Sequence, residues 1–256
     1  MVGEPPPFWQ QDPTGRFTGR ARDYTQGRPS YPAKAIRAIL EGLGDPATLV
    51  AADVGAGTGI ASRLLADQGV TVLAVEPNAA MRAAATPHPR VTAIDGTGER
   101  TGLADGQVAL VLCAQSFHWF EPRAALAELR RVLAPEGRLA LLWNVRDDHD
   151  AVTAAYSRLV REAAGDRLTE AHGEGVEALL PEAGFRDVRV LSFTFEQAVD
   201  AAGLRARAAS ASYVPAEGPA REALERGLRA LHAESAGPDG RLRLVYRTTL
   251  YLARRG

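Results

Sequence analysis

The chain has 256 residues, and its 30 basic and 31 acidic side chains leave a formal net charge of −1. This balance offers no electrostatic footprint for nucleic acid or for an anionic membrane. The single cysteine, Cys113, cannot form an internal disulfide, and no apolar run approaches the about 20 residues of a membrane span. The first residues also lack the basic start and apolar core of a signal peptide. We therefore expect a soluble, cytoplasmic protein that binds neither nucleic acid nor a membrane.

Apolar runs of strand length alternate with segments of helical spacing over the first 145 residues. Strands are predicted at residues 48–54, 70–75, 90–94, 108–114 and 137–144, and helices near 33–43, 59–68, 78–85 and 122–133. This alternation is typical of right-handed crossover units, which build a parallel sheet covered by helices on both faces. The sequence therefore predicts an α/β fold.

The pattern changes after about residue 145. Helices are expected at 151–165, 174–183, 199–209 and 217–235, and alternating segments at 185–197 and 241–255 indicate two more strands. We predict that these two strands close the edge of the same sheet and that the helices form a small cap.

The stretch "DVGAGTG", Asp53 to Gly59, joins the first predicted strand to the next helix. Glycines in such a turn can take positive φ and let a ligand approach the main chain with no side chain in between. Open parallel sheets bind ligands at the carboxyl ends of their strands, where Glu76 ends the second strand. An acid there can accept hydrogen bonds from both hydroxyls of a ribose. The turn and the acid therefore predict a site for a dinucleotide or for an adenosyl group.

The spacing of the glycines separates these two ligands. Dinucleotide sites carry G-x-G-x-x-G, which places a pyrophosphate at a helix N-terminus, whereas this chain has G-x-G-x-G. Asp53, two residues before the first glycine, would repel a pyrophosphate but suits a cationic amino group or a sulfonium. The sequence thus favours a cationic adenosyl ligand, and a nicotinamide-dependent oxidoreductase is the weaker alternative.

Six motifs follow one another in the order and spacing of a known family: "DVGAGTG", "VLAVEPNAAM", "GTGERTGL", "VLCAQSFHWF", "LRRVLAPEGRLALLWN" and "YRTTLYLARR". Through them the chain resembles the class I S-adenosylmethionine-dependent methyltransferases, and within these the small-molecule branch of trans-aconitate methyltransferase-like (methyltransferase type 11) proteins. The resemblance is specific over about residues 17–145 and looser beyond them. It implies a Rossmann-like, seven-stranded, mostly parallel sheet whose last strand is antiparallel.

The resemblance also implies which residues bind S-adenosylmethionine. From the methionine end to the adenine these are Asp53 with the main chain of Gly55, Ala56 and Gly57; Gln115 near the methyl group; Glu76 at the ribose; and Pro77, Met81, Thr97, Gly98 and Glu99 around the adenine. The segment "RARDYTQGRPSYP" would fold over the cofactor, with Tyr24 and Arg28 as contacts. The domain plan is then a lid at 1–32, a cofactor-binding core at 33–145, and cap helices with closing strands at 146–256.

The reaction that the resemblance implies needs few catalytic groups. The sulfonium makes its methyl group electrophilic, so the enzyme mainly aligns the acceptor with the methyl carbon and the sulfur and excludes water. We expect a small-molecule acceptor, such as a natural product or a carboxylate metabolite, because a cap follows the fifth strand where an RNA-modifying enzyme would carry a basic extension. S-adenosylhomocysteine would be the product. The alternative is a cyclase-type protein that binds the cofactor without transferring its methyl group.

Three further segments hold candidates for substrate contacts. In "FHWF", His118 could be a general base for a hydroxyl acceptor or a structural histidine beside two aromatic rings. Trp119, in a loop on the ligand side of the sheet, could contact the substrate or simply pack against its neighbours. In "WNVRDDHD", Trp143 and Arg146 are candidates, with Arg146 as an anchor for a substrate carboxylate. In "SASYV", Tyr213 could hydrogen-bond the substrate or simply end a helix.

The acids of "WNVRDDHD" also raise the question of a metal. Hard oxygen ligands suit Mg²⁺, which orients catechols in some methyltransferases. Adjacent residues point in different directions, however, and an Asp cluster before a helix is more often its cap. We therefore expect no metal here.

Overall fold

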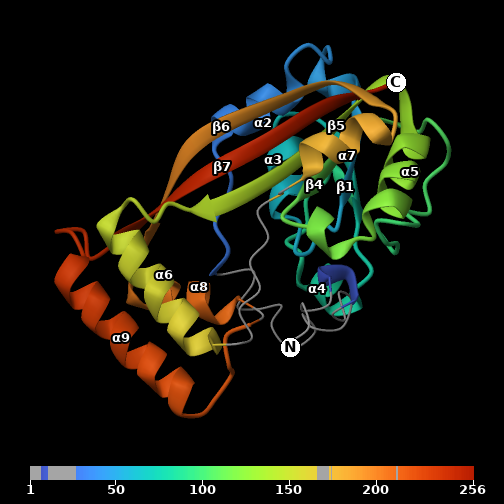
Figure 1. Ribbon diagram of the computed structural model, residues 1–256. Coiled ribbons are helices and arrows are strands. Elements are labelled where there is room, and N and C mark those ends of the chain that lie inside the picture. Colours follow the sequence, from blue (N-terminus) through green and yellow to red (C-terminus); the bar gives the residue numbers. More distant parts are fainter. Residues whose placement is uncertain (1–6, 11–26, 166–172, 174, 212) are drawn as a thin grey trace.

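The computed structural model describes residues 7–10, 27–165, 173, 175–211 and 213–256. In these residues seven strands form one sheet in the order β3-β2-β1-β4-β5-β7-β6 (Figure 1). The strands are β1 (Val50–Val54), β2 (Thr71–Val75), β3 (Val91–Ile94), β4 (Val108–Ala114), β5 (Leu133–Arg146), β6 (Phe185–Val199) and β7 (Leu242–Arg255). The first five pair in parallel, and β7 runs antiparallel to β5 and to β6. The predicted sheet with a reversed last strand is confirmed.

Helices cover both faces of this sheet. They are α2 (Ala33–Leu40), α3 (Ile60–Ala66), α4 (Ala79–Ala84), α5 (Pro122–Val132), α6 (Ala151–Ala164), α7 (Val176–Glu182), α8 (Ala201–Ala209) and α9 (Pro219–Ser235), with short 3-10 turns η1 (Phe8–Gln10), η2 (Pro46–Thr48) and η3 (Phe117–Trp119). Apolar side chains of α2 and α3 pack on one face, and those of α5 and α7 pack on the other. None of these described helices has the length and apolar character to span a bilayer.

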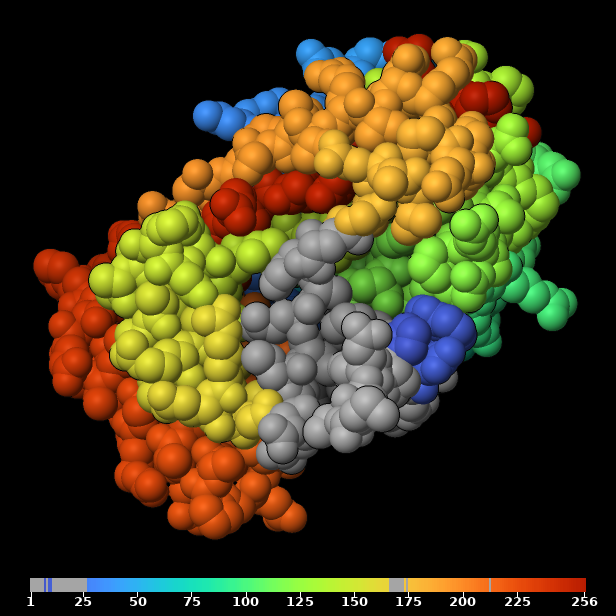
Figure 2. Space-filling model, viewed as in Figure 1, coloured from blue at the N-terminus to red at the C-terminus, as the bar shows by residue number. Residues whose placement is uncertain are grey.

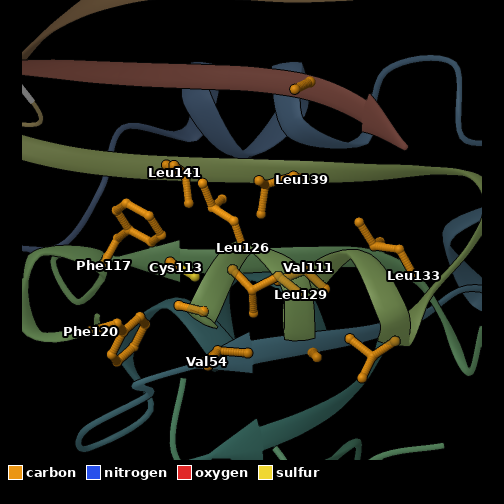
Figure 3. Packing of buried hydrophobic residues seen from close by; sticks show 14 of the residues in the cluster. Val54, Val111, Cys113, Phe117, Phe120, Leu126, Leu129, Leu133, Leu139 and Leu141 are labelled. Atoms are coloured by element: carbon orange, nitrogen blue, oxygen red, sulfur yellow. The ribbon is translucent and has the colours of Figure 1, made fainter. Parts of the chain in front are cut away.

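The face of the sheet beneath α5 is a closely packed apolar core. Leu126 and Leu129 of α5 lie against Val111 and Cys113 of β4 (Figure 3). Each of these four side chains is at most 1% exposed, and burying such a leucine contributes about 1.5–3 kcal/mol. Burial also raises the pKa of the Cys113 thiol well above its ordinary value. Cys113 is therefore a packing residue rather than a nucleophile.

The cap is a second lobe, built on the projecting ends of β6 and β7. These strands have 15 and 14 residues, which correspond to about 50 and 46 Å at 3.3 Å per residue. They are longer than β1 to β4, and α6, α8 and α9 pack around their far ends through residues such as Leu204, Leu228 and Tyr246. Figures 1 and 2 show α6 and α9 as a lobe apart from α5 and α7. The core and the cap thus share one sheet.

Several element boundaries differ from the sequence prediction, and at two of them the cause is pairing between strands. The strand expected at 137–144 extends over Leu133–Arg146, because the chain enters the sheet directly from α5 and its pairing with β4 shifts between Val108 and Leu110. The helix expected from residue 199 begins at Ala201, because β6 stays paired with β7 as far as Val199. Pairing with a distant strand decided both boundaries, and local periodicity does not report it.

Candidate active site

The glycine turn between β1 and α3 has the backbone that its sequence predicted. Gly55, Gly57 and Gly59 take φ values of 71°, 58° and 74°, a region that costs other residues about 1–2 kcal/mol. Space also excludes a side chain at Gly55, where a Cβ would lie 2.5 Å from Ser116 Cβ and 3.0 Å from Phe120 Cζ. The turn therefore presents bare main chain at the carboxyl end of β1.

Glu76 fastens this turn to the end of β2. Its Oε2 accepts the backbone N–H of Gly57 at 2.9 Å, and its Oε1 accepts that of Asn78 at 2.9 Å. The side chain is 9% exposed, and burial raises the pKa of the carboxyl group. A carboxylate offers about four acceptor positions, so two remain for a ligand. Two backbone hydrogen bonds therefore hold Glu76 in place at the strand end, and its contact with a ribose stays a prediction.

Asp53 is a second buried acid, at the end of β1. It is 1% exposed, and its Oδ2 accepts a hydrogen bond from Ser62 Oγ at 2.5 Å. Its Oδ1 is buried and has no partner in the described structure. Burial raises the pKa of Asp53 to about 6. A buried carboxylate oxygen without a donor is costly, so this position suits a cationic group of a ligand.

A pocket opens beside Asp53 at the carboxyl ends of β1, β4 and β5. Its walls are formed by Arg28, Pro29, Tyr31, Asp53, Gly55, Ala56, Ile60, Ala61, Ala114, Gln115 and Asn144. It brings together five residues that the sequence had assigned to cofactor binding, namely Arg28 from the segment expected to fold over the cofactor, and Asp53, Gly55, Ala56 and Gln115.

The wall formed by Gln115 and Asn144 is a locked arrangement. Gln115 has a φ of 56°, and its Nε2 donates to the carbonyl oxygen of Asn144 at 3.0 Å. Asn144 Nδ2 donates to the carbonyl of Ser30 at 2.9 Å, while its Oδ1 accepts from Thr248 Oγ1 at 2.6 Å. Sequence reasoning missed Asn144. The signal that could have found it is a polar residue at the end of the otherwise apolar strand predicted at 137–144.

The residues predicted around the adenine gather on the same edge but outside this pocket. Met81 is buried, Pro77 is half-buried, and Thr97 accepts the backbone N–H of Arg100. A Cβ on Gly98 would lie 2.4 Å from Phe120 Cγ, so the Phe120 ring packs directly on its backbone.

Glu99 supports the start of the next helix. Its Oε1 accepts the backbone N–H of Glu121 at 2.8 Å, directly before α5. Gly98 and Glu99 thus contact Phe120 and Glu121, which follow η3, and hold this loop in place. Their contacts with the adenine stay predictions. The predicted contact Tyr24 lies outside the described residues.

His118 is oriented by a tryptophan from the core. The indole Nε1 of Trp143 donates to His118 Nδ1 at 3.3 Å, and an indole nitrogen can only donate. In the neutral ring the proton therefore sits on Nε2, which makes Nε2 a donor. Trp143 itself is 1% exposed and stacks edge-on with Tyr251 at 5.7 Å. The structure places Trp143 in the core as a support for His118.

The remaining substrate candidates lie at different depths. Trp119 is half-buried and tilted against His118, with ring centroids 4.9 Å apart. Arg146 ends β5 with its guanidinium carbon 5.7 Å from the ring centroid of Tyr156. Tyr213 is half-buried against the core of the cap. Arg146 and Tyr213 therefore belong to the cap side of the site, and Trp119 belongs to the core side.

The acids after β5 are occupied with local structure. Asp150 caps α6 by accepting the backbone N–H of Thr153 at 2.8 Å, as the sequence predicted for an acid before a helix. Asp148 pairs with Arg161 at 2.8 Å. Within the described residues no group of three or more His, Cys, Asp or Glu side chains could hold a metal ion.

Comparisons with known proteins show the family of this chain. Residues 52–141 match the family model of a methyltransferase domain. An uncharacterized methyltransferase of Mycobacterium tuberculosis (strain ATCC 25618 / H37Rv) is 41% identical over 143 residues, 54% of this chain and 56% of that protein, so the chain spans about half of its length. One of Schizosaccharomyces pombe (strain 972 / ATCC 24843) is 33% identical over 67% of this chain and 68% of that protein.

A solved structure extends the likeness to the whole fold. It is a putative type II methyltransferase from Anaeromyxobacter dehalogenans, with a TM-score of 0.67 and 28% identity over 89% of this chain and 97% of that one. The sheet order is that of a Rossmann-like methyltransferase fold, and the bare turn and the two buried acids lie where the sequence predicted the S-adenosylmethionine site. The chain belongs to the S-adenosylmethionine-dependent methyltransferases. Its place in the trans-aconitate-like branch stays a prediction.

Proposed function

We propose that this protein transfers the methyl group of S-adenosylmethionine to a small molecule bound between the strand ends and the cap. The observation that carries the proposal is the unmatched Oδ1 of Asp53 beside a bare glycine turn, with Glu76 fixed at the neighbouring strand end. Such a site would recognise the cationic groups and the ribose diol of S-adenosylmethionine, and the bare turn would let the cofactor lie against the main chain. The residues present therefore fit the cofactor.

Each residue of the pocket has a distinct task in this proposal. Asp53 would accept a hydrogen bond from the amino group of the methionine part. Arg28, which lines the same pocket, would pair with the carboxylate of that part. Glu76 would accept from the ribose hydroxyls with the acceptor positions that Gly57 and Asn78 leave open. Gln115 and Asn144, which are joined by a hydrogen bond, would form the wall around the reacting methyl group.

When bound, the cofactor supplies an electrophilic methyl group, and the chain supplies alignment and exclusion of water. A general base is required only for an acceptor that must lose a proton. The hydrogen bond from Trp143 leaves the proton of neutral His118 on Nε2, which argues against His118 as a base through that nitrogen. We propose that His118 and Trp119 position the acceptor from η3.

The cap supports a small acceptor. It closes the end of the sheet with three helices on long strands, and the chain carries a net charge of only −1. A polymeric nucleic-acid substrate would require a positive face. Arg146, at the end of β5, and Tyr213, after α8, are the proposed substrate contacts on the cap side.

Calorimetric titration of the purified protein with S-adenosylmethionine, S-adenosylhomocysteine and a nicotinamide dinucleotide tests the proposal. We expect micromolar binding of the two adenosyl ligands alone. The Asp53→Asn variant serves as the matched control, because it keeps the shape of the site and removes the charge. With an acceptor in hand, formation of S-adenosylhomocysteine distinguishes methyl transfer from a cyclase-type reaction, in which none forms.

A further inference from the structure

The cap buries an arginine that has no acidic partner among the described residues. Arg207 of α8 is 6% exposed. Its Nε donates to Tyr246 Oη at 3.0 Å, and its Nη1 lies 3.4 Å from Ser210 Oγ. Both partners are neutral, whereas a guanidinium stays charged at physiological pH. A buried cation without a counter-charge is costly, so an anion that reached it would be bound favourably.

Tyr156 of α6 supplies a second unmatched group in the same cap cluster. It is 0% exposed, and its Oη is buried with no hydrogen-bond partner in the described part of the chain. Burial raises the pKa of its hydroxyl to about 12, against a smaller lowering by Arg207. The hydroxyl therefore keeps its proton and can donate to an acceptor. A cation without a counter-charge and a neutral donor without an acceptor together suit an oxyanion.

Acids near this cluster are already engaged. Asp148, whose field reaches Arg146, pairs with Arg161 at 2.8 Å. Arg146 adds a further positive charge 5.7 Å from the Tyr156 ring centroid. Arg207 and Arg146 both act on the Tyr156 hydroxyl as positive charges.

The cluster is linked to the cofactor pocket by short hydrogen-bonded steps. The carbonyl of Ser210 accepts from Arg28 Nη2 at 3.3 Å, and Arg28 lines the pocket. On the other side, Tyr246 Oη donates to Gln197 Oε1 at 3.1 Å, and Gln197 Nε2 donates to the carbonyl of Gly27 at 3.3 Å. The site therefore adjoins the pocket through residues 27 and 28 and is not a remote surface feature.

We propose that Arg207 and Tyr156 form an oxyanion-binding site in the cap, which holds a carboxylate or phosphate group of the substrate away from the atom that accepts the methyl group. The inference rests on the proposed function, since it assigns the anion to the acceptor molecule. The forked guanidinium can hold two oxygens of one anion, and Tyr156 donates a third hydrogen bond. Such an anchor would orient the substrate from its charged end.

Titration of the whole protein with malonate and with inorganic phosphate tests this site. Ionic strength is held constant with sodium chloride, and S-adenosylhomocysteine is saturating, so that Arg28 is not the group that captures the anion. We expect Arg207→Gln to weaken anion binding by about tenfold or more, as loss of charge-assisted hydrogen bonds does. Arg205→Gln, an exposed arginine on the same helix, should bind as the wild type does. The tighter of the two anions names the class of group.

A second variant keeps the test valid if Arg207→Gln does not fold. Tyr156→Phe removes an unmatched buried hydroxyl, so the ligand-free protein should melt no lower than the wild type while its anion affinity falls about tenfold. Equal anion affinity in wild type and Tyr156→Phe, no binding at constant ionic strength, or binding only without S-adenosylhomocysteine would each overturn the proposal. Loss of S-adenosylhomocysteine binding by the wild type would instead refute the cofactor site, so the two failures are distinguishable.

Discussion

Gly57 donates its backbone N–H to the carboxylate of Glu76, 2.9 Å away, and thereby joins the turn after β1 to the end of β2. The two residues are 19 positions apart in the chain. The same carboxylate also accepts from Asn78, so both main-chain groups hold the acid in the orientation that a ribose would meet. Rigid placement of the acceptor before the ligand binds reduces the cost of ordering.

Gly57→Val should abolish measurable S-adenosylmethionine binding in a protein that still folds. The residue has a φ of 58°, and a branched side chain would both strain this backbone and fill the space of the ligand. Gly240→Val is a matched control, because Gly240 has a φ of 70° and open space around it, far from the site in sequence and outside the pocket wall. Calorimetry and thermal melting should show similar destabilisation of both variants but loss of affinity in one.

Glu76→Ala should weaken S-adenosylmethionine binding by about 10- to 100-fold, because two hydrogen bonds to a charged group are lost. It should also lower the free energy of unfolding by about 1–3 kcal/mol, since the backbone N–H groups of Gly57 and Asn78 lose their acceptor. Asp95→Asn, an exposed acid on the same side of the sheet, should change neither quantity much. Nicotinamide dinucleotide binding that persists in Glu76→Ala, without adenosyl binding, would contradict the assignment.

Asp53 should make cofactor affinity depend on pH. Burial raises its pKa from 3.8 to about 6, so the acid is protonated in the ligand-free protein below about pH 6. Binding of a cation requires the ionised form, and affinity for S-adenosylmethionine should fall by about tenfold per pH unit below that point. Calorimetry between pH 7 and 5 measures this slope, and Asp53→Asn should abolish it.

The stability of the ligand-free protein should respond to Asp53 in the opposite sense. A folded-state pKa above the unfolded value means that the folded protein binds more protons between about pH 4 and 6. The contribution of Asp53 to the free energy of unfolding is therefore fully present below about pH 4 and is lost as the pH rises to about 6. Denaturant titrations of wild type and Asp53→Asn isolate this contribution, which should be missing from the variant.

His118→Asn should lower kcat by less than about tenfold, because asparagine keeps an oxygen that can accept the N–H of Trp143. Loss of a general base would cost about 10²- to 10⁴-fold. The pH profile of kcat/KM gives an independent reading. A limb near pH 6.5 that disappears in His118→Asn would show that the imidazole removes a proton after all.

Much of the core could be predicted from the sequence, because its signals are local. Alternation of apolar runs and helical segments gave β1 to β4 and α2 to α5, since burial on both faces demands apolar strands wherever they occur. The turn from Asp53 to Gly59 was equally visible, because only glycine tolerates three positive φ values in five residues. The acid Glu76 followed from the position of a strand end.

Tertiary structure alone decided the pocket wall and the cap. Asn144 meets Gln115 because β5 lies beside β4, and it meets Ser30 because the chain just before α2 reaches the end of β5. Arg28 and Ser210 are 182 positions apart and meet at one hydrogen bond. The sequence by itself determined the fold class and the cofactor half, because periodicity and backbone conformation are short-range properties. Which buried polar groups come close to one another, Arg207 and Tyr156 among them, depends on long-range packing that no local pattern encodes.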